Sequence, residues 1–278
     1  MLAGLSAALA AAVVFGFAAI LQARAVRRLP TSYAESAGAL LVLLRQPLFL
    51  AAVALNLVGF LLHLVALRLV PLYLAQAGIS ASLAVAALLA VLTLHERLGP
   101  LDWLAVAAVT VGLVLLAGAS GDIGAVDASG TFLTWLLAAI VAVAVGGYAV
   151  ARSRSRVAAT LLGFLAGLGF AGSGIAARIL PGLTPAQLWD APAAYALPVS
   201  GGLAFVLYSL ALQRGSVTVA TAPMIVMQTL SPAVVGLLLL GDEVRDGWAA
   251  VGVVGFVLTL AGAIALARFE RGPSIPEQ

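Results

Sequence analysis

The stretch PMIVMQTLSP, residues 223–232, places two prolines, a glutamine, a threonine and a serine inside a long apolar run. A second stretch, PLYLAQ at residues 71–76, has the same order of Pro, four apolar or aromatic residues and Gln. A helix in lipid gains nothing from a side-chain amide, or from proline, which has no backbone N–H to donate. We therefore expect these stretches to line the protein interior or to interrupt a regular helix.

The composition indicates a membrane protein. Of the 278 residues, 63% are hydrophobic and 9% are charged, and the mean hydropathy is +1.16, whereas about a quarter of the residues in a soluble domain are charged. The chain has no cysteine, which excludes disulfides and thiolate metal sites. It carries no RNP-like, zinc-finger or basic-helix motif, so the predicted partners are membrane lipids and a small-molecule or ion substrate, not nucleic acid. A homodimer is also compatible with the sequence.

Hydrophobic runs predict nine transmembrane helices in one all-α domain, because about 20 apolar helical residues cross the hydrocarbon core. The segment 25–47 is weaker: its apolar part is too short to span, which favours an interfacial or re-entrant segment, with a tenth helix as the alternative. Residues 2–21 lack the positive start of a signal peptide and exceed its apolar length, which favours a retained first helix. The predicted spans are 2–23, 48–69, 71–94, 101–119, 132–151, 157–177, 193–213, 216–240 and 248–267.

The arginines orient these spans. The net charge is +3, and all 14 basic residues are arginines. With the N-terminus outside, eleven of them lie inside, and Arg68, Arg178 and Arg245 lie outside, which follows the positive-inside rule. An odd number of spans places the C-terminus, with its short polar tail at 269–278, inside. The lack of lysine beside abundant alanine, arginine and glycine is typical of a GC-rich bacterial genome, so we expect a bacterial cytoplasmic membrane.

The neighbourhoods of the two Pro/Gln stretches also repeat. Predicted spans two to four return as spans seven to nine in the opposite orientation, so the chain divides into halves at about 2–119 and 132–268. Inverted repeats are a common design of secondary transporters, whose substrate site lies near the bilayer midplane between the repeats. The matching segments are HLVALR (63–68) with YSLALQ (208–213), GLVLLAGA (112–119) with GFVLTLAGA (255–263), and HERL with GDEV, which contain Glu96 and Glu243.

These motifs resemble the EamA-type repeat of the drug/metabolite transporter (DMT) superfamily. The shared features are a short helix that ends in an ALR or ALQ turn, a next helix followed by Glu, and a glycine-rich closing helix. The resemblance covers most of residues 2–268 and implies a central cavity and alternating access. Most members have ten helices. The chain is more similar to a related branch, the NIPA-type magnesium transporters, in its nine spans, in VPLYL (70–74), in TVATAPMIVMQ (218–228) and in the NERL-like HERL.

Three polar residues inside predicted spans are the leading candidates for a substrate pathway. His63 is the one ionisable residue well inside a span, where such residues usually face a cavity or a partner, and its imidazole could bind a solute or relay a proton. Gln76 and Gln228 occupy matching places in the repeats, and each amide offers an acceptor and two donors. The alternative is a structural hydrogen bond between helices. Weaker candidates for the same lining are Asn56, Tyr73, Ser80, Tyr208, Thr229 and Ser231.

A further group of residues is predicted to shape or gate the helices. Glu96 and Glu243 lie at span ends, where a charged side chain loses little hydration free energy. We expect them to pair with nearby arginines or to cap the next helix. Gly163 and Gly167 form a small-xxx-small pattern, which indicates close helix packing. The prolines expected to bend or open their helices are Pro71, Pro223 and Pro232.

The sequence predicts neither an enzyme nor a cofactor. His95 and Glu96 begin an HExxH zinc motif, but position 99 is Gly. Ser120, in GASG, has no histidine on a matching span to serve as its base. No phosphate-binding loop is present either.

Together, these features predict a transporter that moves a small solute without ATP, through a midplane cavity lined by spans one, two, three, six, seven and eight. Few carboxylates belong to this lining, which favours a neutral or zwitterionic metabolite over magnesium, an ion that sheds water reluctantly. The alternatives are a NIPA-like magnesium or divalent-cation transporter and a non-transporting scaffold or lipid-handling protein. Any metal ligands are unknown.

Overall fold

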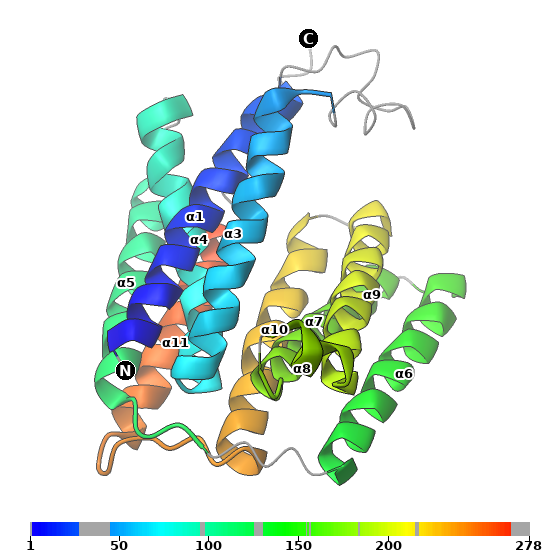
Figure 1. Ribbon diagram of the computed structural model, residues 1–278. Helices are drawn as coiled ribbons and strands as arrows, with labels where there is room; N and C mark the ends of the chain where they lie inside the picture. The colour runs from blue at the N-terminus through cyan, green and yellow to red at the C-terminus, as the bar shows by residue number, and fades with distance from the viewer. Residues whose placement is uncertain are drawn as a thin grey trace.

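The computed structural model describes residues 2–27, 45–94, 98–124, 130–153, 155, 157–182, 184–214 and 217–267 (Figure 1). Within these ranges, nine helices are long and apolar enough to cross a membrane, so the prediction of an all-α, multi-pass membrane protein is confirmed. A short helix, α8 (Pro185–Trp189), is added. The nine long helices are α1 (Leu2–Arg27), α3 (Pro47–Leu69), α4 (Leu72–Leu94), α5 (Pro100–Ala119), α6 (Gly130–Arg152), α7 (Ala158–Arg178), α9 (Pro192–Arg214), α10 (Val217–Leu239) and α11 (Ala249–Leu266).

Each predicted span coincides with one long helix, because long apolar runs bounded by polar or proline-containing segments leave little freedom in placing helices. Proline stands at the start of α3 and α5, where its missing N–H is not needed. Pro71 follows Val70, whose backbone is extended, and this break separates α3 from α4. The predicted interfacial or re-entrant segment at 25–47 lies mostly outside the described residues, although α1 continues to Arg27.

The helices form two sets with similar internal packing. α1 packs mainly against α3 and α4, and α7 packs in the same way against α9 and α10. The closing helices α5 and α11 pack against each other. In Figure 1, α1, α3, α4, α5 and α11 make one side of the molecule, and α6 to α10 make the other. The main helix contact between the two sides is that of α10 with α4.

Glycines let the helix backbones approach closely. A Cβ atom on Gly163 would overlap the carbonyl oxygen of Ala220, and one on Gly167 would lie 2.5 Å from the carbonyl oxygen of Met224, so α7 meets α10 through these positions. A Cβ on Gly112 of α5 would lie 2.6 Å from the carbonyl oxygen of Gly255 on α11. Lipid tails are as apolar as leucine, so close van der Waals packing at small residues holds such helices together.

The loops after α5 and α10 meet at the end of the molecule where α1 begins (Figure 1). Ser120 and Val244 form an isolated antiparallel β-bridge. The Gly121 N–H donates to the Glu243 carbonyl at 3.2 Å, and the Arg245 N–H donates to the Ala119 carbonyl at 3.0 Å. These bonds join the end of the first predicted half to the loop between α10 and α11 of the second.

Candidate functional site

A cavity of about 140 Å³ lies between the two sets of helices. It is lined from α1, α3, α4, α7 and α10, which are five of the six spans predicted to line a midplane cavity; α9 does not contribute lining residues. Its polar lining consists of His63, Gln76, Ser173 and Gln228. The structure thus brings together the three leading candidates of the sequence, which come from both repeats.

The leading candidates have no hydrogen-bond partner within the part of the chain that the structure describes. His63 and Gln76 are buried, at 6% and 4% exposure, and Gln228 is half-buried. Buried polar groups in folded proteins are nearly always paired, because an unpaired one loses its water without compensation. Side chains that line a cavity without an internal partner are therefore available to a solute or to water.

Two small residues of α7 help to form this site. A Cβ atom on Gly174 would overlap the side-chain nitrogen Nε2 of Gln76, so glycine makes room for that amide. The hydroxyl of the adjacent Ser173 donates to the Leu197 carbonyl of α9 at 2.9 Å. The Gly163 and Gly167 pattern on the same helix predicts close helix packing. It does not reveal the space that Gly174 leaves for Gln76, because this space depends on how α4 meets α7.

The weaker candidates lie elsewhere than the cavity. Two of them bond locally: Asn56 Nδ2 donates to Ala52 O at 3.0 Å, and Thr229 Oγ1 donates to Ile225 O at 2.8 Å, each one turn back on its own helix. Such local bonds satisfy a hydroxyl or amide inside an apolar helix. The remaining four are Tyr73, bonded to the Glu243 carbonyl, Tyr208, bonded to Thr221, Ser231, near Met227 Sδ, and Ser80, which is buried.

The residues predicted to bend, pack or gate the helices differ in their surroundings. α10 continues as one helix through Pro223 and Pro232, so the prolines do not divide it. Glu243 has an exposed side chain, and it is its backbone that ties the two loops. Glu96 lies outside the described residues. Pro71 is fully buried directly after the α3–α4 break.

A buried ion pair lies beyond the cavity, at the end of the molecule where the two loops meet. Arg178, the last residue of α7, binds Asp242, in the loop after α10, with 2.9 Å between Nη2 and Oδ1. The two side chains are 1% and 0% exposed. The guanidinium also donates from Nη1 to the carbonyls of Leu67, at 2.8 Å, and Val70, at 3.4 Å.

The carboxylate of Asp242 completes this arrangement. Its Oδ2 accepts the N–H of Leu72 at 2.7 Å, and its Oδ1 accepts the N–H of Gly124 at 3.1 Å. Charge-assisted hydrogen bonds of this kind are about twice as strong as neutral ones. We call Arg178, Asp242 and the backbone groups that they bind the clamp. The clamp joins the α3–α4 break and the loop after α5, in the first half, to α7 and the loop after α10, in the second.

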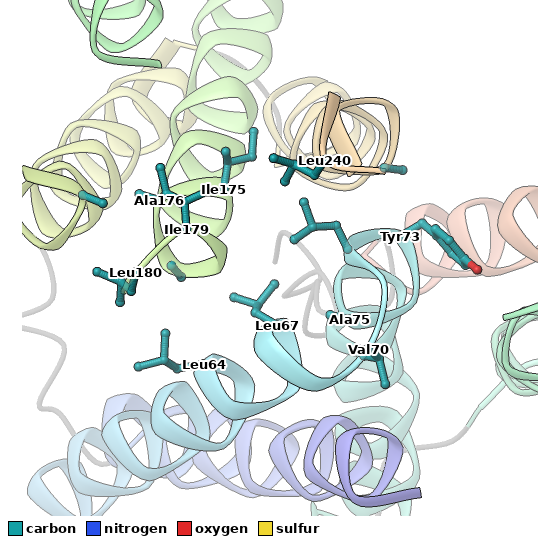
Figure 2. Close-up of a cluster of buried hydrophobic side chains, with 14 of the residues drawn as sticks. Leu64, Leu67, Val70, Tyr73, Ala75, Ile175, Ala176, Ile179, Leu180 and Leu240 are labelled. Atoms are coloured by element: carbon teal, nitrogen blue, oxygen red, sulfur yellow. The ribbon is translucent and has the colours of Figure 1, made fainter. Parts of the chain in front are cut away.

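The clamp adjoins the cavity. Leu67 and Ala177 line the cavity, while the carbonyl of Leu67 binds Arg178, the residue after Ala177. Figure 2 shows side chains from α3, from the end of α7 and from Leu240 converging in the apolar layer between them. The pairing of Arg178 with Asp242 was not predicted from the sequence. There, Arg178 only orients the spans, and Glu243 is named as a candidate but the adjacent Asp242 is not. The available signal was a second acid in GDEV.

Comparisons of the chain with protein-family models, with curated proteins and with solved structures find no match. Among the described residues, no group of three His, Cys, Asp or Glu side chains is placed to hold a metal ion. The function of the site is therefore argued from its geometry.

Proposed function

We propose that the protein is a DMT-type transporter of a bacterial cytoplasmic membrane, which moves a small uncharged or zwitterionic solute by alternating access without ATP. The observation that carries this proposal is the cavity between the two sets of helices, into which His63, Gln76 and Gln228 bring polar groups without internal partners. In transporters built from inverted repeats, the substrate site lies at such an interface.

The clamp supplies the closed end that alternating access requires. Opening this end would separate Arg178 from Asp242 and release the backbone groups of the α3–α4 break. The similar packing of α1 on α3 and α4, and of α7 on α9 and α10, supports an exchange of roles between the halves, so that the opposite end closes when the clamp opens.

The other two functions receive less support. Mg²⁺ is usually bound through one or two carboxylates with its remaining water, and no carboxylate of the described part of the chain lines the cavity. A scaffold or lipid-handling protein would have no need for unpartnered amides from both repeats inside its core, where helix-to-helix hydrogen bonds would be expected instead.

Cysteine labelling tests the proposal directly, because the chain has no native cysteine. Ser173→Cys places a thiol in the cavity with little change of volume. In proteoliposomes, we expect an uncharged, hydrophilic and membrane-impermeant thiol reagent to modify Cys at position 173 from either side of the membrane. Asp242→Asn in the same background should raise labelling from the clamp side by about tenfold or more, because it shifts the population toward the open end.

A matched control is Val141→Cys, at a residue of α6 that is 61% exposed on the apolar surface. In a folded protein this thiol lies in lipid and should stay unlabelled with and without Asp242→Asn, so its labelling would report unfolding. If position 173 stays unlabelled from one side even when the clamp is broken, transport through this cavity is ruled out.

A further inference from the structure

We infer that the solute is a neutral, planar, single-ring molecule with an amide or lactam edge. The inference rests on the proposed function, since it assigns a substrate class to the same cavity. It follows from the charge, the volume, the hydrogen-bonding groups and the aromatic surface of the lining.

The charge of the lining excludes ions and narrows the solute from uncharged or zwitterionic to uncharged. Among the described residues, no Asp, Glu, Lys or Arg side chain lines the cavity. The ion pair of the clamp, Arg178 with Asp242, is compensated internally, and Arg68 is not one of the lining residues. A carboxylate or ammonium group that enters such a site loses its water without gaining a counter-ion, which is strongly unfavourable.

The volume sets the size of the solute. The cavity holds about 140 Å³, close to the engineered cavities of about 150 Å³ that bind benzene. A solute of one ring with a small substituent fits this space.

The polar groups select the edge of the solute. Gln76 and Gln228 present amides from opposite repeats, and His63 adds an imidazole. An amide carries both an acceptor and donors, and a neutral imidazole carries one of each. A solute amide or lactam has the same complement of donor and acceptor in one plane, so it can pair with the amides of the lining. An apolar ring alone would leave these groups unpaired, which costs affinity.

The apolar lining selects the flat body of the solute. Phe15, Phe60 and Phe170 come from α1, α3 and α7 and contribute aromatic rings to the cavity wall. Phe15 also packs on Gly59, where a Cβ atom would lie 2.9 Å from its ring, so this ring is held in place. Aromatic rings pair favourably in stacked or edge-to-face geometry, and a planar ring gains more from them than a flexible polyol does.

Nicotinamide and nicotinate provide the test. They have the same pyridine ring and nearly the same shape, but nicotinamide carries a neutral amide where nicotinate carries a charged carboxylate. Binding to the purified full-length protein is measured by isothermal titration calorimetry. We expect nicotinamide to bind and nicotinate to bind at least about a hundredfold more weakly, since the carboxylate would be buried without a counter-ion. Gln228→Leu should weaken nicotinamide binding by about tenfold, because it removes one partner of a buried amide.

Asn56→Leu is the matched control. It makes the same change of an amide to an apolar side chain, at a half-buried residue of α3 outside the lining, whose amide bonds its own helix. Nicotinamide affinity should be unchanged in this variant. Gln228→Asn, which keeps a shorter amide, should retain more binding than Gln228→Leu, and thermal unfolding of each variant shows that it is folded.

The inference is overturned if neither compound binds, if folded Gln228→Leu binds nicotinamide as well as wild type does, or if nicotinate binds at least as well. The last result would place a solute carboxylate on the arginines of the clamp end, where Arg68 Nη1 and Arg178 Nε are buried without a partner among the described residues. Labelling at position 173 needs no ligand, so two-sided labelling without nicotinamide binding refutes the substrate class alone. Binding with one-sided labelling refutes transport alone.

Discussion

The cavity and the clamp are polar sites buried between the same two sets of helices, and they treat their polar groups in opposite ways. In the clamp, Arg178 and Asp242 bind each other and the backbone of two further segments, the α3–α4 break and the loop after α5, while Arg178 Nε has no partner among the described residues. In the cavity, His63, Gln76 and Gln228 have no internal partner in the described part of the chain. The two charges of the clamp compensate each other, which favours one conformation, whereas the amides and the imidazole of the cavity are left for water or a ligand to complete.

The largest effect is expected from breaking the clamp. Asp242→Ala leaves the guanidinium of Arg178 buried without its counter-ion, and removing one partner of a buried pair typically costs about 3–5 kcal/mol. Equilibrium unfolding in mixed detergent micelles measures this loss. Glu243→Ala is the control, because its side chain is exposed and its loss should change the free energy of unfolding by no more than about 0.5 kcal/mol. Equal effects of the two substitutions would contradict the clamp.

A smaller effect is expected from separating the loops around the clamp. A Cβ atom on Gly124 would overlap the carbonyl oxygen of Leu240, so Gly124→Ala must push the two loops apart. We expect a loss of about 1–3 kcal/mol in the free energy of unfolding, as for other overpacked sites. Gly130→Ala, where a Cβ meets nothing within 4 Å, should cause no loss, and a similar loss there would show that the contact is not the cause.

The cavity responds to a glycine change in binding rather than in stability. Gly174→Ala displaces the flexible end of Gln76 while alanine favours the helix by up to about 1 kcal/mol. Nicotinamide affinity should therefore fall by about tenfold in a protein that unfolds no more easily, as calorimetry and thermal unfolding can show. In α9, Gly202→Ala meets no atom within 4 Å and should leave the affinity unchanged; an equal loss there would remove the role of Gln76.

The smallest effect is expected at Thr229, one residue after Gln228. Its hydroxyl bonds the Ile225 carbonyl on its own helix and does not line the cavity. Thr229→Val keeps the shape and removes this local bond, so we expect unchanged nicotinamide binding and a change of no more than about 1 kcal/mol in the free energy of unfolding. A loss of binding as large as that of Gln228→Leu would place the hydroxyl on the solute.

The sequence was informative about the cavity because the repeat marks it. Gln76 and Gln228 share a place in two copies of one motif, and His63 stands out as an ionisable residue inside a span. The weaker candidates could not be sorted in this way. Asn56 and Thr229 lie on helices that are apolar nearly all round, so hydrophobic periodicity does not tell which face turns inward.

The clamp escaped prediction for a different reason. Arg178 and Asp242 are 64 residues apart. Each lies near the end of a span, where a charged residue is common because it can reach water, so its sequence position does not indicate that it is buried. The seat of Gln76 on Gly174 likewise depends on how two helices meet.

The sequence by itself determined that the chain is an all-α membrane protein and where its nine long described helices lie, because crossing about 30 Å of hydrocarbon demands long apolar helices whatever their neighbours. It also marked the residues that an apolar helix has no reason to contain. Only the tertiary structure decided which of these share a cavity, which bond their own helix and which charges pair. Those outcomes depend on distances between segments remote in sequence, and in an apolar bundle they are set by close packing at small residues.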